Sequence, residues 1–313
     1  GSNIDSTDGQ QDYQVTKKLS KLEEEYVLIQ KTCSKQLVYS CDHFCGGLAD
    51  RLDGIMGVFI WALLTGSCFH INYGHPCYLD NFLTPSGVIN WLQPFRMDNM
   101  NFLDFIHPTG EFQRELKQSI QYSNISIDEK YPADNYAIRL NENLFEAFQG
   151  NPMYKEHLEK FGFNEETTSE DGFIMVYDAL FKMTPKIKGA LNEFKQQLEP
   201  DSQLICAQLR IPDRMPIEYL DDNAEQLNNV WTFLKSYQKQ TNFKYFVTTN
   251  YEALRERAKA IFGDELVDTK GPTAHIDIDK KQLACEGHSK VILDFEILSQ
   301  CDVLLISGGS GYG

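Results

Sequence analysis

A short strand, a glycine pair, an apolar helix and a second strand follow one another near the start of the chain. Residues 36–41 and 68–73 have strand-like apolar runs, and residues 48–65 between them are apolar over the length of a helix. Glycines between a strand and a helix are typical of a β–α turn, and parallel strands need a helical crossover. This order predicts that the first half of the chain begins a parallel α/β sheet.

The second half of the chain shows the same alternation more regularly. The expected elements are strands at 203–209, 242–248, 265–268 and 303–307, and helices at 224–241, 251–262 and 289–300. Such alternation predicts a parallel, doubly wound sheet that binds ligands at the carboxyl ends of its strands. Two Rossmann-like α/β domains of this kind would face each other across a cleft.

Two further helical stretches determine where we divide the chain. A helix is expected over residues 15–31, and residues 173–198 are expected to be helical with a break or kink at Pro185. Glu199-Pro200-Asp201 ends that stretch and is taken as the domain boundary. The predicted parts are a protease-cleavage remnant with a stem and helix at 1–36, an α/β domain at 37–199 and a second α/β domain at 200–313.

The charge of the chain limits its partners. Lys and Arg number 29 against 45 Asp and Glu, which gives a formal net charge of −16 at pH 7. Phosphates would be repelled over most of such a surface, so a nucleic-acid or anionic-membrane partner is not expected. The 42 % of hydrophobic residues can form proper cores, and no apolar run reaches the roughly 20 residues that span a bilayer.

The eight cysteines are unevenly distributed along the chain. Five of them lie in its first quarter, namely Cys33, Cys41, Cys45, Cys68 and Cys77. One or two disulfides among these five would imply an oxidising compartment, so we expect the lumen of the secretory pathway (the Golgi), with the cytoplasm as the alternative. Cys206 and Cys301 lie in apolar patterns where buried free thiols are common, and we expect free thiols there.

Three segments at strand ends have the composition of phosphate sites. Gly46-Gly47 would let backbone N–H groups approach an anion at a helix N-terminus, or would simply form a tight turn. Arg210 has a planar fork that suits a diphosphate, or it forms a surface ion pair with Asp213. The run from Ser307 to Gly311, which includes Ser310, would form a second phosphate nest, or is a flexible tail.

Two short motifs have the spacing of metal ligands. Asp277 and Asp279 form an Asp-x-Asp pattern, which holds a divalent cation in one class of sugar transferases. A chain with 45 acidic residues also yields this spacing by chance. The segment from Cys41 to Cys45 has zinc-like spacing but lacks a second pair of ligands. We therefore expect no metal site.

Several segments, in order along the chain, resemble the family of the rhizobial nodulation fucosyltransferase and the eukaryotic core α1,6-fucosyltransferase. The helix and Leu-Ser-Gln-Cys-Asp run at Leu293–Asp302, followed by a strand and a serine-bearing loop, is similar to the end of the core enzymes. The other similar segments are Gly46-Gly47, Cys77–Asp80, Tyr245–Asn250 and Gly271–His275.

The resemblance implies a GT-B fold and a metal-independent, inverting transfer of L-fucose from GDP-fucose to a glycan hydroxyl. The first domain would lie on the acceptor side, and the second would bind the nucleotide sugar. Donor-binding residues would include Gly46, Gly47, Ser307 and Ser310, with His275 matching a histidine of the nodulation enzymes.

Three residues receive specific roles from the same resemblance. Arg210 would hold the β-phosphate of the donor, and Asp294 would bind the edge of the guanine. Glu218 would be the base that deprotonates the acceptor hydroxyl. Inversion needs one such carboxylate, and from the residues themselves Asp213 is the second choice.

The sequence departs from the family pattern at three positions. Gln208 stands in place of a histidine, Ile211 in place of a second arginine and Asn250 in place of an acid. The alternatives are a GT-B transferase with another nucleotide sugar, a metal-dependent one using Asp277 and Asp279, or a non-catalytic protein that binds glycans through its aromatic-rich segment 75–170.

Overall fold

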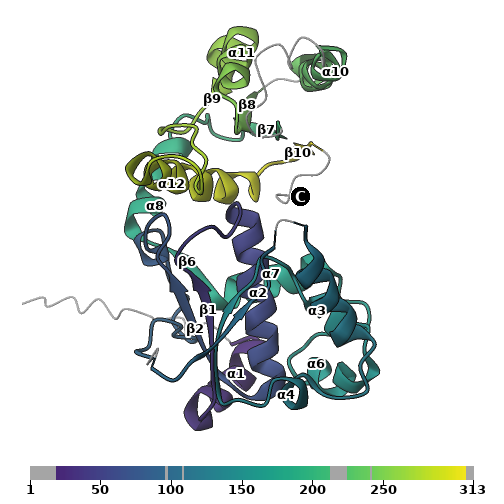
Figure 1. The fold of residues 1–313 in the computed structure, drawn as a ribbon. Coiled ribbons are helices and arrows are strands. Elements are labelled where there is room, and N and C mark those ends of the chain that lie inside the picture. Colours follow the sequence, from purple (N-terminus) through teal and green to yellow (C-terminus); the bar gives the residue numbers. More distant parts are fainter. Residues whose placement is uncertain (1–18, 96–97, 108, 212–223, 240–241, 308–313) are drawn as a thin grey trace, which may run out of the picture.

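Two α/β units, one above the other in Figure 1, make up the structure, which is a computed structural model. It describes residues 19–95, 98–107, 109–211, 224–239 and 242–307. Each unit contains a four-stranded sheet of parallel strands. Among the described residues, every helix falls short of the length and apolar character needed to cross a membrane.

The first sheet has the strand order β2-β1-β5-β4. Its strands are β1 (Gln36–Cys41), β2 (Cys68–Tyr73), β4 (Asn101–Asp104) and β5 (Asn135–Arg139). Helix α2 (Leu48–Thr65) crosses from β1 to β2 and is buried over most of its surface because it is apolar nearly all round. It ends at Gly66, whose φ of 63° is the left-handed conformation that closes a helix. The predicted bounds of β1, α2 and β2 are confirmed.

Short elements surround this first sheet. The helices are α1 (Lys21–Thr32), α3 (Glu111–Gln121), α4 (Ile127–Lys130), α5 (Phe145–Gln149), α6 (Lys155–Lys160) and α7 (Ser169–Leu180), with 3-10 turns at Leu79–Asn81 and Pro152–Tyr154. Helix α1 begins directly after the cap residue Ser20, within the segment where a helix was expected. Strands β3 (Leu83–Pro85) and β6 (Phe181–Met183) form an antiparallel pair.

The sequence left open whether residues 173–198 form one kinked helix or a helix with a break. The structure has two helices there, separated by β6. The break at Pro185 is confirmed, since helix α8 (Pro185–Lys195) begins with this proline after the cap residue Thr184. Proline is favoured at the first position of a helix because the N–H group at that position makes no intrahelical hydrogen bond, so proline loses none by lacking it.

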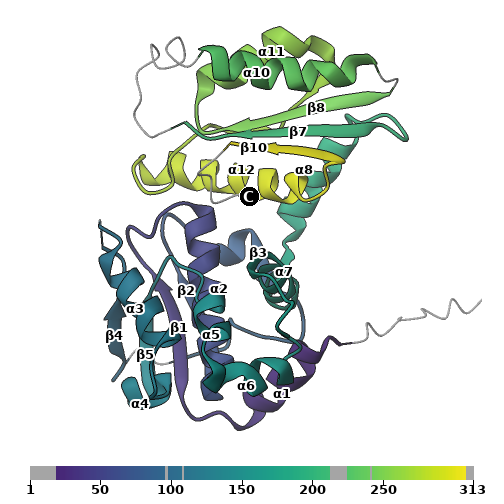
Figure 2. The same cartoon turned by 90° about the vertical axis from the view of Figure 1, so that its right-hand side faces the viewer.

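The second sheet has the strand order β10-β7-β8-β9. Its strands are β7 (Gln203–Leu209), β8 (Phe243–Thr249), β9 (Leu266–Val267) and β10 (Val303–Ile306). In Figure 2, helices α10 (Ala224–Lys235) and α11 (Glu252–Phe262) cover one face, and α12 (Lys281–Leu298) covers the other. Two 3-10 turns, Ser236–Lys239 and Gly263–Glu265, follow α10 and α11. The predicted doubly wound α/β class is confirmed.

Helix α10 ends at Lys235 and passes into a 3-10 turn, short of the expected end at 241. Two other helices also bear on the sequence prediction. Helix α12 begins at Lys281, eight residues before the expected start at 289, because its first two turns bury Ala284, Gly287 and His288 in the tertiary structure. Helix α8 precedes the expected boundary at 199–201, yet it packs against α12. The domain boundary itself stays a prediction.

All eight cysteines are paired in the structure. The disulfides are Cys33–Cys68, Cys41–Cys45, Cys77–Cys285 and Cys206–Cys301. The expectation of free thiols at Cys206 and Cys301 is therefore wrong: β7 and the segment just before β10 are neighbours in the sheet, which brings the two sulfurs together. Two bonds lie within the N-terminal cluster, as expected, and Cys77–Cys285 joins the first half of the chain to α12.

Helix α2 lies unusually close to the chain that follows β5. A Cβ atom added at Gly54 would lie 2.0 Å from the carbonyl oxygen of Leu140 and 2.8 Å from the ring of Tyr39. A backbone carbonyl cannot move away as a flexible side chain can. Gly54 is therefore required for the packing of α2 on the sheet, and through it for the position of the start of α2.

We predict that Gly54→Ala lowers the free energy of unfolding by about 1–3 kcal/mol or more, because overpacking forces the backbone apart. Gly189→Ala is the matched control, since Gly189 lies in α8 with open space where the methyl group would go. There alanine should raise stability by about 0.5–1 kcal/mol through its helix propensity. Urea unfolding of both variants measures the difference, and equal stabilities would contradict this account of the packing.

Candidate active site

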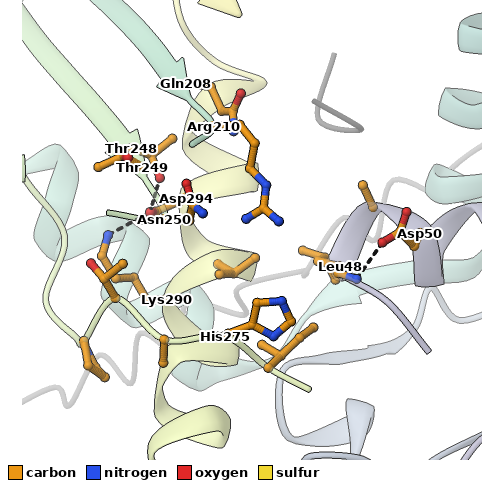
Figure 3. A pocket seen from close by; sticks show the side chains of 17 residues that line it. Leu48, Asp50, Gln208, Arg210, Thr248, Thr249, Asn250, His275, Lys290 and Asp294 are labelled. Carbon is orange, nitrogen blue, oxygen red and sulfur yellow. Dashed lines mark hydrogen bonds and ion pairs between the residues drawn. The ribbon is translucent and has the colours of Figure 1, made fainter. Parts of the chain in front are cut away.

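A cavity of about 240 Å³ lies between the start of α2 and the carboxyl ends of β7 and β8 (Figure 3). Its wall is made by the first turn of α2, the ends of both strands, the segment before α12 and α12 itself. The lining residues are Gly47, Leu48, Ala49, Asp50, Gln208, Arg210, Thr248, Thr249, Asn250, Pro272, Thr273, Ala274, His275, Ile276, Lys290, Val291 and Asp294. The carboxyl edge of a parallel sheet is where α/β proteins bind ligands.

Arg210 follows directly after β7, and its guanidinium extends into the cavity toward the side where Leu48 and Asp50 lie (Figure 3). Its backbone N–H donates to the Oγ of Ser307 at 2.8 Å, which ties the end of β7 to the end of β10. The exposed guanidinium is a fixed positive charge with a planar set of donors, which suits a phosphate group.

Asn250 holds the residue that follows Arg210. Its Oδ1 accepts from the N–H of Ile211 at 2.9 Å, and its Nδ2 donates to the carbonyl oxygen of Ile211 at 2.7 Å. An amide can accept and donate in this way, whereas a carboxylate only accepts. Asn250 therefore braces the strand end from which Arg210 extends.

Asp294 lies at the back of the cavity in a buried polar network. Its Oδ2 accepts from Lys290 Nζ at 2.7 Å and from Thr248 Oγ1 at 2.6 Å, and its Oδ1 accepts from Thr269 Oγ1 at 2.6 Å. Lys290 also donates to Thr269 Oγ1 at 2.6 Å. A carboxylate has about four lone-pair positions, so after these three bonds Asp294 can accept one more N–H group.

The glycine loop is held by carboxylates of the chain itself. The N–H of Gly47 donates to Asp50 Oδ2 at 2.6 Å, while the N–H of Gly46 donates to Asp277 Oδ2 at 2.7 Å. Gly47 lines the cavity, but Gly46 does not. Its amide faces Asp277, so the structure places only one of the two predicted loop glycines beside the cavity.

Asp277 forms a buried ion pair with Arg51, and both side chains are fully shielded from solvent. Arg51 also donates from Nε to the carbonyl oxygen of Gly46 at 2.8 Å and from Nη1 to that of His75. The other carboxylate of the Asp-x-Asp pattern, Asp279, accepts from the N–H of His275 at 2.7 Å. The two acids thus have separate partners, and the part of the chain that the structure describes contains no cluster of metal-ligating side chains.

His275 lies in the cavity wall, where its Nδ1 accepts from the N–H of Asp277 at 3.2 Å. In this bond Nδ1 is the acceptor. Of the predicted donor-binding residues, Gly47, Arg210, His275 and Asp294 share the cavity, and Ser307 supports Arg210. Asp213, Glu218 and Ser310 lie outside the described residues.

Two charged residues of this cavity, Asp50 and Lys290, were not predicted from the sequence. The available signal for Lys290 was its spacing of four residues before Asp294, which places both on one face of a helix. For Asp50 it was the position three residues after Gly47, typical of an acid that bonds the first amides of a helix.

The sequence matches no protein-family model and no curated protein. Its fold is that of solved fucosyltransferases. The NodZ fucosyltransferase from Bradyrhizobium has a TM-score of 0.60 at 12 % identity, over 90 % of this chain and 91 % of that one. A mutant of Arabidopsis thaliana FUT1 in complex with GDP has a TM-score of 0.62 at 14 % identity, over 94 % of this chain and 72 % of that one.

A third similar structure is NodZ α-1,6-fucosyltransferase co-crystallised with GDP, with a TM-score of 0.57 at 12 % identity over 90 % of this chain and 91 % of that one. These likenesses confirm the expected GT-B architecture. They also confirm, at the level of the fold, the resemblance of the sequence to the nodulation and core α1,6-fucosyltransferases.

The Arg51–Asp277 pair generates a prediction about stability. Asp277→Asn leaves a buried guanidinium without its counter-charge, which should lower the free energy of unfolding by about 3–5 kcal/mol. Asp279→Asn is the matched control, two residues away and exposed, and should change stability by no more than about 0.5 kcal/mol. Urea unfolding of the two variants makes the comparison, and a wild-type midpoint for Asp277→Asn would contradict the assigned role.

Proposed function

We propose that the protein is an inverting, metal-independent fucosyltransferase that moves L-fucose from GDP-fucose to a glycan hydroxyl. The observation that carries this proposal is the position of Arg210, whose guanidinium extends into a cavity with Asp294 and Lys290 on its wall. The likeness in fold to fucosyltransferases crystallised with GDP supports the choice of donor.

The charges of the cavity suit the leaving group. Transfer of fucose leaves a negative charge on the GDP, and a preorganised positive group stabilises that charge in the transition state. We expect the guanidinium of Arg210 to form bidentate hydrogen bonds with the diphosphate. The donor therefore needs no added cation to balance this charge, which is why we propose a metal-independent reaction.

Asp294 is placed to recognise the base of the nucleotide. Guanine presents adjacent N–H donors along one edge, and Asp294 has one acceptor position left after its bonds to Lys290, Thr248 and Thr269. One acceptor position takes one N–H donor, which guanine and uracil both offer. The choice of a guanosine nucleotide therefore rests on the likeness in fold to fucosyltransferases crystallised with GDP.

The site of action is a further part of the proposal. Four disulfides fit an oxidising compartment, and we propose the lumen of the secretory pathway, in the Golgi. Glu218, the base expected from the family resemblance, and Asp213, the second choice from the residues themselves, lie outside the described residues.

Thermal unfolding with GDP and with UDP, each with and without EDTA, tests the donor. A ligand at 100 times its dissociation constant stabilises by about 2.7 kcal/mol, which for a chain of this size is several degrees. We expect a shift with GDP that EDTA leaves unchanged, and none with UDP. Arg210→Ala should abolish most of the shift and lower fucose transfer by about 100-fold or more.

Arg257→Ala is the matched control, because it removes an arginine from α11 that does not line the cavity. It should keep the wild-type shift with GDP. Equal shifts with GDP and UDP would favour another nucleotide sugar, and GDP binding without any transfer would favour a non-catalytic glycan-binding protein. No shift with either nucleotide would contradict the proposed donor.

A further inference from the structure

Asp50 is a charged residue on the opposite side of the cavity from Asp294. It is the third residue of α2 and lines the cavity with Gly47, Leu48 and Ala49. Figure 3 shows its carboxylate on the α2 side, with the guanidinium of Arg210 extending toward that side from the end of β7. A sugar held through its diphosphate on Arg210 would therefore lie between the second sheet and Asp50.

The carboxylate of Asp50 is fixed in orientation by one hydrogen bond. Its Oδ2 accepts from the N–H of Gly47 at 2.6 Å, which also caps the first turn of α2. Within the described part of the chain, no hydrogen bond is made by Oδ1. One oxygen thus holds the group in place while the other is available to a hydroxyl in the cavity.

The surroundings of Asp50 make it a better proton acceptor than an exposed aspartate. Burial, together with Glu142 and Asp277, raises the pKa of Asp50, whereas the N–H of Gly47 and the charge of Arg210 act in the opposite direction. A diphosphate bound to Arg210 would cancel that opposing positive charge. The pKa of Asp50 would then rise further, so the group becomes more basic once the donor is bound.

We propose that Asp50, in place of Glu218 or Asp213, is the catalytic base of the transfer, a role that rests on the function proposed above. The acceptor hydroxyl gives its proton to Oδ1 of Asp50 as its oxygen forms a bond to C1 of fucose. The bond from C1 to the phosphate oxygen breaks at the same time, and its electron pair leaves with GDP, beside Arg210. Attack from the α2 side, opposite the leaving group, inverts the configuration at C1.

Asp53 is the neighbour against which this assignment can be tested. It lies one helical turn further along α2 and does not line the cavity. Burial raises its pKa to about 7, with smaller contributions from Asp50 and Glu142 and an opposing one from Lys117. The same exchange at the two positions, Asp50→Asn and Asp53→Asn, therefore compares two carboxylates of one helix that differ in access to the cavity.

The assay is the release of GDP from GDP-fucose, with water as the acceptor, at pH 5 to 9. Asparagine at position 50 can still accept from the N–H of Gly47, so the cap and the fold are kept. We expect Asp50→Asn to lower kcat by about 100-fold or more, to lose the acidic limb of the pH profile and to keep the thermal shift with GDP. Asp53→Asn should keep the wild-type rate.

Sodium azide separates a base from a residue that only positions others. The azide anion attacks C1 without losing a proton, so it should restore turnover of Asp50→Asn and yield fucosyl azide. An Asp50→Asn variant that is as fast as the wild type, or slow and not rescued by azide, would overturn the assignment, as would loss of activity in Asp53→Asn alone. A wild type that releases no GDP with either water or azide as the acceptor would overturn the transferase proposal and with it the role of Asp50. Wild-type release that Asp50→Asn retains would overturn only the role of Asp50.

Discussion

The buried ion pair between Arg51 and Asp277 determines how the two halves of the molecule meet. A buried pair is favourable only when its remaining donors and acceptors are satisfied, because desolvation of two charges is costly. Here Arg51 also donates to the carbonyl oxygens of Gly46 and His75, and Asp277 accepts from the N–H groups of Cys45 and Gly46. The start of α2 is thereby fixed against the segment before α12, which brings Asp50 and Arg210 to the same cavity.

Much of the fold could be predicted because its signals are local. The apolar runs of β1, α2, β2 and β7 and the glycines that bound α2 specify these elements from neighbouring residues alone, and their bounds agree with the structure. The start of α12 and the pairing of Cys206 with Cys301 could not be obtained in this way. Both depend on which segments are adjacent in space, and no short stretch of sequence contains that information.

The site was predicted less completely than the fold. Arg210 and Asp294, which the sequence grouped, line one cavity, because each stands where a strand or helix of a recognisable pattern brings it to the carboxyl edge of the sheet. Asp277 was considered only as a metal ligand, since its partner Arg51 is 226 residues away along the chain. Asp50 was overlooked because an acid in the first turn of a helix is usually explained by capping alone.

The Cys77–Cys285 disulfide limits how far the two parts of the chain that line the cavity can move apart. It fixes a point of the first half to α12, and the Arg51–Asp277 pair lies between the same two parts of the chain. While the bond is intact, the two parts cannot separate at these cysteines. Reducing surroundings would leave the buried ion pair there without this covalent support.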